Sequence, residues 1–118
     1  MKIVNRETFL RLPAGTLYSK YEPCVFGDLE IKGESCRNDF YSQGIADAVK
    51  SNSSDEYADV LLSAAASGES FEMDFMDELR DGLFDDGQLF AVWERADTLA
   101  LLKRIASTIG VLIIEPTQ

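Results

Sequence analysis

The acidic residues of this chain are concentrated in one part of the sequence. Its 118 residues include 21 Asp and Glu against 11 Lys and Arg, for a net charge of -10. The stretch from Ser51 to Glu94 holds twelve acids and one base, Arg80, so it carries -11, whereas the remainder holds nine acids and ten bases and carries +1. This segregation predicts a negative field over one region, which attracts cationic partners and repels nucleic acid.

The length and composition predict a single globular domain over residues 1–118. Apolar residues make up 46% of the chain, enough to build a core, whereas a disordered acidic chain would lack them. No apolar run approaches the roughly 20 residues of a membrane span, and the first residues contain no apolar export signal. We therefore expect a cytoplasmic protein.

The two cysteines, Cys24 and Cys36, have no metal-binding spacing. Reduced thiols are the favoured interpretation, and a disulfide between them stays open because both fall in the same expected hairpin.

The chain contains no histidine. This excludes Ser-His-Asp and Cys-His catalytic pairs, histidine-containing zinc sites and a histidine general base. Carboxylate- or lysine-based enzymes survive the exclusion but are a minority. We expect a protein without catalytic residues, metal or cofactor.

The first half of the chain predicts a short helix followed by strands. Asn5 can cap a helical turn that points Phe9, Leu10 and Leu12 inward. Strands are then expected at residues 16–21 and 26–32, the second with one solvated face. Residues 39–43 suit a third strand, although a helical spacing follows directly.

The second half predicts two longer helices. One is capped by Ser54, runs to Ser67 and ends at Gly68; the other is capped by Asp97 and runs to Ile109. Each helix has one stripe of residues that is expected to face the core. The stripe consists of Tyr57, Val60, Leu61, Ala64 and Ala65 in the first helix, and of Thr98, Leu101, Leu102, Ile105 and Ile109 in the second.

Three further runs in the second half have strand-like patterns. Residues 71–75 alternate as in a half-exposed strand, with Phe71, Met73 and Phe75 inward. The run from Gln88 to Trp93 is apolar on both faces, as in a central strand. The β-rich run 111–114 could pair at a sheet edge or meet a partner. The predicted fold class is α+β, a mainly antiparallel sheet of about four to six strands packed against the two main helices.

The segment from Glu69 to Asp86 contains eight acids and one base, a net charge of -7 over 18 residues. Repulsion at this density is easier to tolerate when a basic partner neutralises it. The candidate partner-binding residues are Glu69, Glu72, Asp74, Asp77, Glu78, Asp81, Asp85 and Asp86. Two other interpretations stay open: a solvated face that maintains solubility, and a loose calcium site among Asp81, Asp85 and Asp86.

Two further stretches are LPAGTLYSKYEPCVFG at residues 12–27 and RDGLFDDGQLFAVWE at residues 80–94. Both resemble small, largely uncharacterised proteins of bacteriophages and prophages. The size, acidity and single-domain build are also similar in type to anti-CRISPR and other anti-defence proteins, some of which mimic the charge of DNA. The resemblance implies a protein of the infected or lysogenic bacterial cytoplasm, and it carries no site residues with it.

These observations lead to one function and two alternatives. The leading hypothesis is a phage-type inhibitor that binds a host defence protein or nucleoprotein complex and blocks nucleic-acid binding through its acidic, DNA-mimicking surface. The first alternative is a non-catalytic accessory domain that homodimerises or binds a small ligand. The second is a carboxylate-dependent enzyme.

Overall fold

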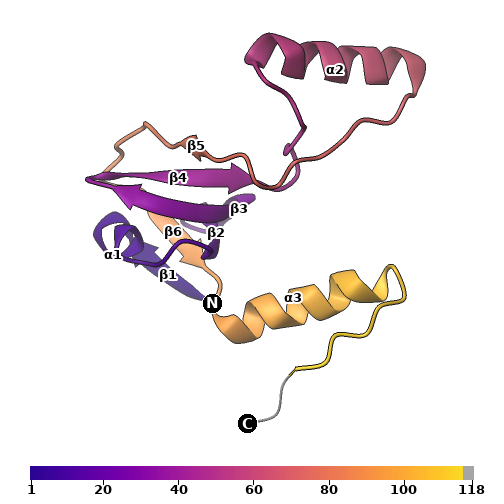
Figure 1. Ribbon diagram of the computed structural model, residues 1–118. Coiled ribbons are helices and arrows are strands. Elements are labelled where there is room, and N and C mark those ends of the chain that lie inside the picture. The colour runs from indigo at the N-terminus through magenta and orange to yellow at the C-terminus, as the bar shows by residue number, and fades with distance from the viewer. Residues whose placement is uncertain (116–118) are drawn as a thin grey trace.

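A computed structural model describes residues 1–115 as one antiparallel sheet with three helices (Figure 1). In chain order the elements are β1 (Lys2–Asn5), α1 (Arg6–Leu10), β2 (Leu17–Glu22), β3 (Val25–Cys36), β4 (Asp39–Gly44), α2 (Ser54–Ser67), β5 (Leu79–Arg80), β6 (Leu89–Val92) and α3 (Arg95–Ser107). The predicted α+β class and the antiparallel sheet are confirmed. None of the helices within residues 1–115 is long and apolar enough to cross a membrane.

The six strands lie in the order β1-β6-β2-β3-β4-β5. The late strand β6 is inserted between the two N-terminal strands β1 and β2 and pairs with both. The predicted central strand at residues 88–93 is therefore confirmed, and its residues Phe90, Ala91 and Val92 are buried. The strand predicted at residues 39–43 forms β4, and the helical spacing that follows it does not form a helix.

An aromatic cluster beneath α1 forms the core. The Phe9 ring stacks on Phe90 with 3.9 Å between ring centroids and meets Tyr18 and Phe40 at 4.7 and 5.0 Å. Asn5 caps α1 as predicted, since its Oδ1 accepts a hydrogen bond from the Thr8 N–H at 2.9 Å. Leu10 and Leu12 pack against the same cluster, so the predicted inward face of this short helix is confirmed.

The two long helices begin one and three residues, respectively, before the predicted positions. Ser53 caps α2, because its Oγ accepts a hydrogen bond from the Glu56 N–H at 3.1 Å, and Gly68 ends the helix with a left-handed φ of 75°. The N-cap residue of α3 is Glu94, and the Asp97 carboxylate accepts a hydrogen bond from the Glu94 N–H at 3.1 Å. Asp97 therefore belongs to the first turn of α3, which ends at Ser107.

The prediction that both long helices pack on the sheet is wrong. No residue of α2 is buried, and Ala106 is the one buried residue of α3. Figure 1 shows both helices projecting beyond the sheet. The reason lies in α1, which is short but brings Phe9 into the centre of the aromatic cluster and so covers the face that the longer helices were expected to cover.

Two of the expected strands are also absent within residues 1–115. In the run 71–75 only Met73 makes a bridge, to Val49, and Phe71, Met73 and Phe75 are exposed. The edge position beside β4 is occupied by the two-residue strand β5 instead. Residues 111–114 are irregular and turn back along α3, where the Val111 N–H donates to the Ala106 carbonyl at 3.0 Å.

The two cysteines are exposed free thiols. Cys24 immediately precedes the long strand β3 and Cys36 ends it, so the length of this extended strand separates them. A disulfide within one chain is excluded, because bridged Cα atoms lie within about 7 Å.

Candidate acidic binding site

The eight candidate acids follow the chain from the end of α2, past the edge strand β5, to the start of β6. Seven of them are exposed or half-buried, as a surface for a partner requires. Asp81 differs, because its side chain is only 7% exposed and its carboxylate meets the Lys20 Nζ at 2.5 Å and the Arg6 Nη1 at 3.8 Å. Asp81 is therefore part of an internal ion-pair network.

The same network contains Asp39, which sequence reasoning did not single out. Its carboxylate is fully buried and accepts hydrogen bonds from the Arg80 Nε at 3.0 Å and the Gly82 N–H at 3.1 Å. Burial opposes ionisation, but the hydrogen bonds from the Phe40 and Gly82 N–H groups and from Arg80 outweigh it, so the pKa of Asp39 is lowered. This network ties β4 to β5 and α1, and it accounts for Arg80, the single base of the acidic segment.

The remaining acids of the segment have different surroundings. Glu72 pairs with Lys50 at 3.2 Å on the surface, and Asp85 accepts the Gly87 N–H at 3.0 Å in a turn. Among the described residues Glu69, Glu78 and Asp86 form no ion pair. Neither these acids nor any other Asp, Glu and Cys side chains in residues 1–115 gather into a group of three that could hold a metal ion, which includes the proposed calcium set.

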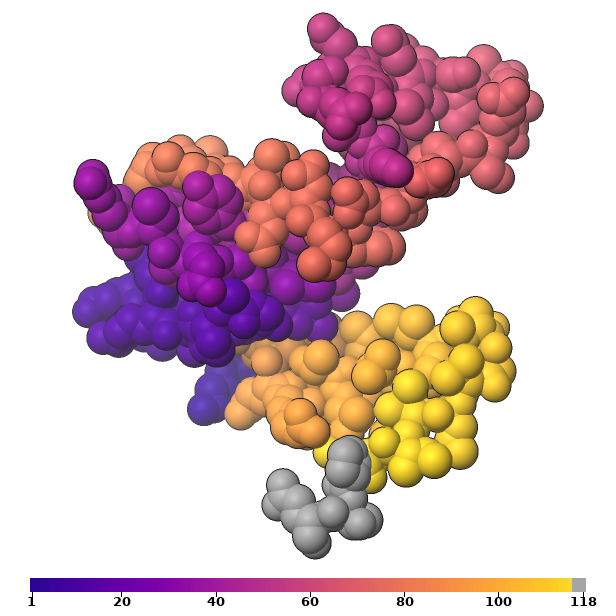
Figure 2. Space-filling model, viewed as in Figure 1, coloured from indigo at the N-terminus to yellow at the C-terminus, as the bar shows by residue number. Residues whose placement is uncertain are grey.

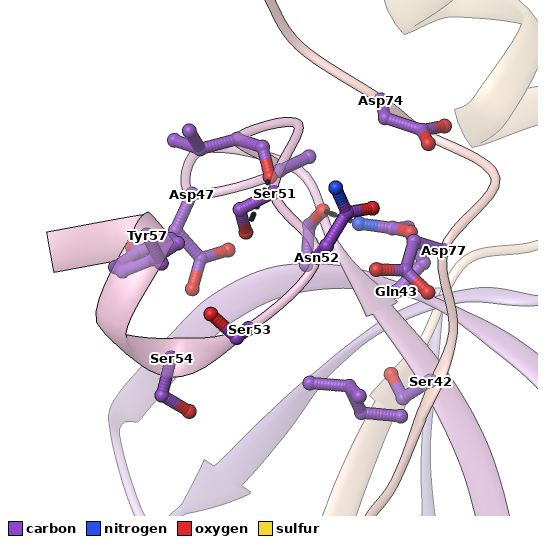
Figure 3. Close-up of a pocket in the computed structure, with 14 residues that line it drawn as sticks. Ser42, Gln43, Asp47, Ser51, Asn52, Ser53, Ser54, Tyr57, Asp74 and Asp77 are labelled. Atoms are coloured by element: carbon purple, nitrogen blue, oxygen red, sulfur yellow. Dashed lines mark hydrogen bonds between the residues drawn. The ribbon is translucent and has the colours of Figure 1, made fainter. Parts of the chain in front are cut away.

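Asp74 and Asp77 line a pocket of about 520 Å³ between the connection that follows β4, the start of α2 and the segment before β5 (Figure 3). Figure 3 shows Asp47 beside the start of α2, with Asp74 and Asp77 on the facing segment. The full lining is Ser42, Gln43, Gly44, Asp47, Ala48, Val49, Ser51, Asn52, Ser53, Ser54, Tyr57, Asp74, Asp77 and Leu79. Three carboxylates and no Lys or Arg are present among these lining residues.

Backbone hydrogen bonds bring the two acidic walls of the pocket together. The Asp74 N–H donates to the Ala48 carbonyl at 2.7 Å, and the Lys50 N–H donates to the Glu72 carbonyl at 2.9 Å. At Gly44 a side chain would collide with the Asp47 carboxylate, so glycine makes room for this acid at the end of β4. Asp74 also accepts the Met76 N–H at 2.9 Å, which orients its carboxylate.

Gln43, in the floor of the site, has an unsatisfied acceptor. The residue is 6% exposed, and its Nε2 donates to the Gly44 carbonyl at 2.7 Å. Its Oε1 has no hydrogen-bond partner among the described residues. An unsatisfied buried acceptor is costly, so a bound hydrogen-bond donor that reached Gln43 through a small side-chain shift would be favoured.

The electrostatics of the pocket are set by its carboxylates. The positive N-terminal end of α2 already has acceptors within the chain. Ser53 accepts the Glu56 N–H, and the Glu56 carboxylate accepts the Asn52 N–H at 3.2 Å. Ser42, at the other side of the pocket, donates a hydrogen bond to the Glu30 carboxylate at 3.3 Å. Burial raises the pKa of Glu30, and the Ser42 hydrogen bond partly offsets this rise. The lining of the pocket therefore carries three carboxylates and no base, which suits an ammonium or guanidinium group.

Comparison with known proteins finds no family model, no curated protein and no solved structure that matches this chain. The site therefore rests on its own geometry. Sequence reasoning found Asp74 and Asp77 from the charge of their segment. It missed Asp47 and Gln43, which lie in a part of the chain without excess charge, and only the pocket that they line with Asp74 and Asp77 connects them with the segment.

Proposed function

We propose that this protein is a non-catalytic inhibitor that binds a basic surface of another protein. The observation that carries the proposal is the pocket lined by Asp47, Asp74, Asp77 and the unsatisfied Gln43 acceptor, with no base among its lining residues. A volume of about 520 Å³ has room for a long basic side chain, and it falls within the usual range of ligand sites, roughly 300–1,000 Å³.

In this proposal the pocket seats one Lys or Arg of the partner, and the other exposed acids of the acidic segment contact further bases. These acids are Glu69, Glu72, Glu78, Asp85 and Asp86. Carboxylates form short, charge-assisted hydrogen bonds with ammonium and guanidinium groups, as phosphates do. The protein would thus occupy the place of nucleic acid on a basic channel and prevent nucleic acid from binding.

The partner class that fits this chemistry is a nucleic-acid-binding protein or nucleoprotein complex. The resemblance of residues 12–27 and 80–94 to phage and prophage proteins suggests a bacterial host. The size, acidity and single-domain build, similar in type to anti-defence proteins, suggest a host defence complex as the target, which would make the chain an anti-CRISPR or other anti-defence protein acting in the bacterial cytoplasm. The strongly negative field also disfavours direct binding of DNA or RNA by this chain.

A pocket variant tests the proposal. Asp47→Asn, Asp74→Asn and Asp77→Asn together remove three charges with little change in shape, and a charge-matched control carries Glu22→Gln, Asp28→Asn and Glu34→Gln on exposed positions elsewhere. Fluorescence anisotropy with a labelled arginine-rich peptide should show binding to the wild type at low salt. The pocket variant should bind at least ~100-fold more weakly, since each charge-assisted contact contributes about 1.5–3 kcal/mol.

The control variant should bind nearly as well as the wild type, and added salt should weaken both. Proteins captured from a bacterial lysate by the wild type, but not by the pocket variant, would then be tested for DNA binding with and without this protein. Equal peptide affinity for the wild type and pocket variant would contradict the proposal, as would a mobility shift of duplex DNA by the chain alone. Tighter binding of free arginine or a polyamine than of the peptide would favour the small-ligand alternative instead.

A further inference from the structure

Two parts of the chain project beyond the sheet without a packing partner. We call residues 53–68, which contain α2, the α2 arm, and residues 94–115, which contain α3 and the segment that returns along it, the C-terminal arm. Figure 2 shows the α2 arm joined to the rest of the molecule by a narrow connection, and the C-terminal arm beside the sheet. Neither arm contributes a side chain to the aromatic core cluster.

The C-terminal arm exposes six large aliphatic side chains. Three of them are more than three-quarters exposed, Ile109 at 76%, Leu112 at 81% and Ile114 at 80%. The others are Leu102, Ile105 and Val111. Leu102 and Ile105 lie on one face of α3, and Ile109 follows just beyond its end, so the three together form an apolar stripe.

The α2 arm has an apolar face of its own. Leu62 is 70% exposed, and the stripe of Tyr57, Val60, Leu61 and Ala64 is only half-buried. Helices of about 12–15 residues are marginal in water by themselves and are stabilised in proteins by packing of an apolar face. A 14-residue helix without a buried residue therefore needs a partner surface.

The exposed area fits a second copy of the chain. The accessible surface is 8510 Å², whereas a compact monomer of 13.1 kDa is expected to expose about 6,400 Å². The excess is on the order of 2,000 Å² per chain, so two chains could bury roughly 4,000 Å² together, within the range of permanent dimers. The radius of gyration of 16.4 Å also exceeds the ~13.5 Å expected for a compact chain of this length.

The two arms are complementary in charge and length. Within residues 53–68 there are three acids, Asp55, Glu56 and Asp59, and no base. On α3, Lys103 and Arg104 form no ion pair within the described residues. The helices have 14 and 13 residues, so both are about 20 Å long.

We propose that two copies of this chain form a symmetric dimer in which the α2 arm of each packs antiparallel on the C-terminal arm of the other. The antiparallel arrangement brings the acidic start of α2 to the basic end of α3, and it buries both apolar stripes. A two-fold axis repeats the contact, so neither arm is left without a partner. This dimer does not require the basic partner of the acidic pocket.

Charge exchange between the arms tests the dimer. One variant carries Lys103→Glu and Arg104→Glu, and the second carries Asp55→Lys and Asp59→Lys. Light scattering coupled to size exclusion should give the wild type twice the single-chain mass of 13.1 kDa at micromolar concentration. Each variant alone should dissociate at least ~30-fold more readily, because like charges then face each other across the interface, and an equimolar mixture should recover the dimer.

An apolar variant tests the same contact independently. Ile105→Asp with Ile109→Asp alters side chains that are exposed in the single chain, so Trp93 fluorescence should stay native while the dimer dissociates ~100-fold more readily or more. Val25→Asp with Leu83→Asp, exposed positions outside both arms, is the matched control and should leave the dimer intact. A single-chain mass for the wild type, a dimer that survives Ile105→Asp with Ile109→Asp, or failure of the mixed charge variants to recover the dimer would overturn the proposal.

Discussion

Replacing Phe9 by Ala is expected to lower the free energy of unfolding by about 3–5 kcal/mol, a large part of the stability of a domain of this size. Phe9 is fully buried and contacts the rings of Tyr18, Phe40 and Phe90. Removal of the Phe9 ring leaves a cavity between α1 and these three rings. Urea unfolding followed by the fluorescence of Trp93 at a fixed protein concentration measures the loss.

The control for this experiment is Phe26→Ala, at an exposed aromatic that contacts Tyr21 with 5.3 Å between ring centroids. It should cost about 1.5 kcal/mol or less, the contribution of a single exposed aromatic pair. Similar losses for Phe9→Ala and Phe26→Ala would mean that the cluster beneath α1 is not the main core.

Replacing Asp39 by Asn is expected to cost about 3–5 kcal/mol at neutral pH, because the buried Arg6 guanidinium loses an ionised neighbour and Arg80 loses its ion-pair partner. The size of this loss should depend on pH. Because the pKa of Asp39 is lowered in the folded protein, its ionised form stabilises the fold above the ordinary carboxyl pKa of about 3.9. That contribution disappears as the pH falls through the folded-state pKa.

Wild type and Asp39→Asn should therefore differ most near neutral pH and converge in acid below about pH 4. The comparison requires urea unfolding of both proteins over this pH range. Glu72→Gln, which removes the exposed pair with Lys50, serves as the control and should cost less than about 1 kcal/mol. A difference between wild type and Asp39→Asn that stays constant down to acid pH would show that the carboxylate acts through shape and not through charge.

The local elements of this protein could be predicted from its sequence because they depend on nearby residues. Asn5 begins α1 through a hydrogen bond to its side chain, and Gly68 ends α2 through a hydrogen bond from its backbone N–H. The run 88–93 could be assigned to the middle of a sheet because residues that are apolar on both faces lose exposure only in an internal strand. The same reasoning failed for residues 71–75 and 111–114, since alternation or β-propensity does not say whether a neighbouring strand is available.

The acidic segment was predictable as a charged region, but the sites within it were not. Asp81 and Asp77 lie four residues apart in one charged run, yet one is held by Lys20 and Arg6 inside the structure and the other lines the pocket. The surroundings of Asp81 are set by Lys20 and Arg6, which lie about 60 or more positions earlier in the chain. Those of Asp77 are set by Asp47 and the start of α2. Contacts over such separations leave no local pattern in a single sequence.

The sequence by itself determined the approximate positions of the three helices and of β2, β3, β4 and β6, and where the negative charge accumulates, because capping, periodicity and charge act over a few residues. Only the tertiary structure decided that the five-residue helix α1 covers the core while the longer α2 and α3 project away from it. An apolar stripe predicts that a helix will be buried but not which surface will bury it. Which helix is buried depends on which side chains fill the space over the sheet, and here Phe9 of α1 fills it.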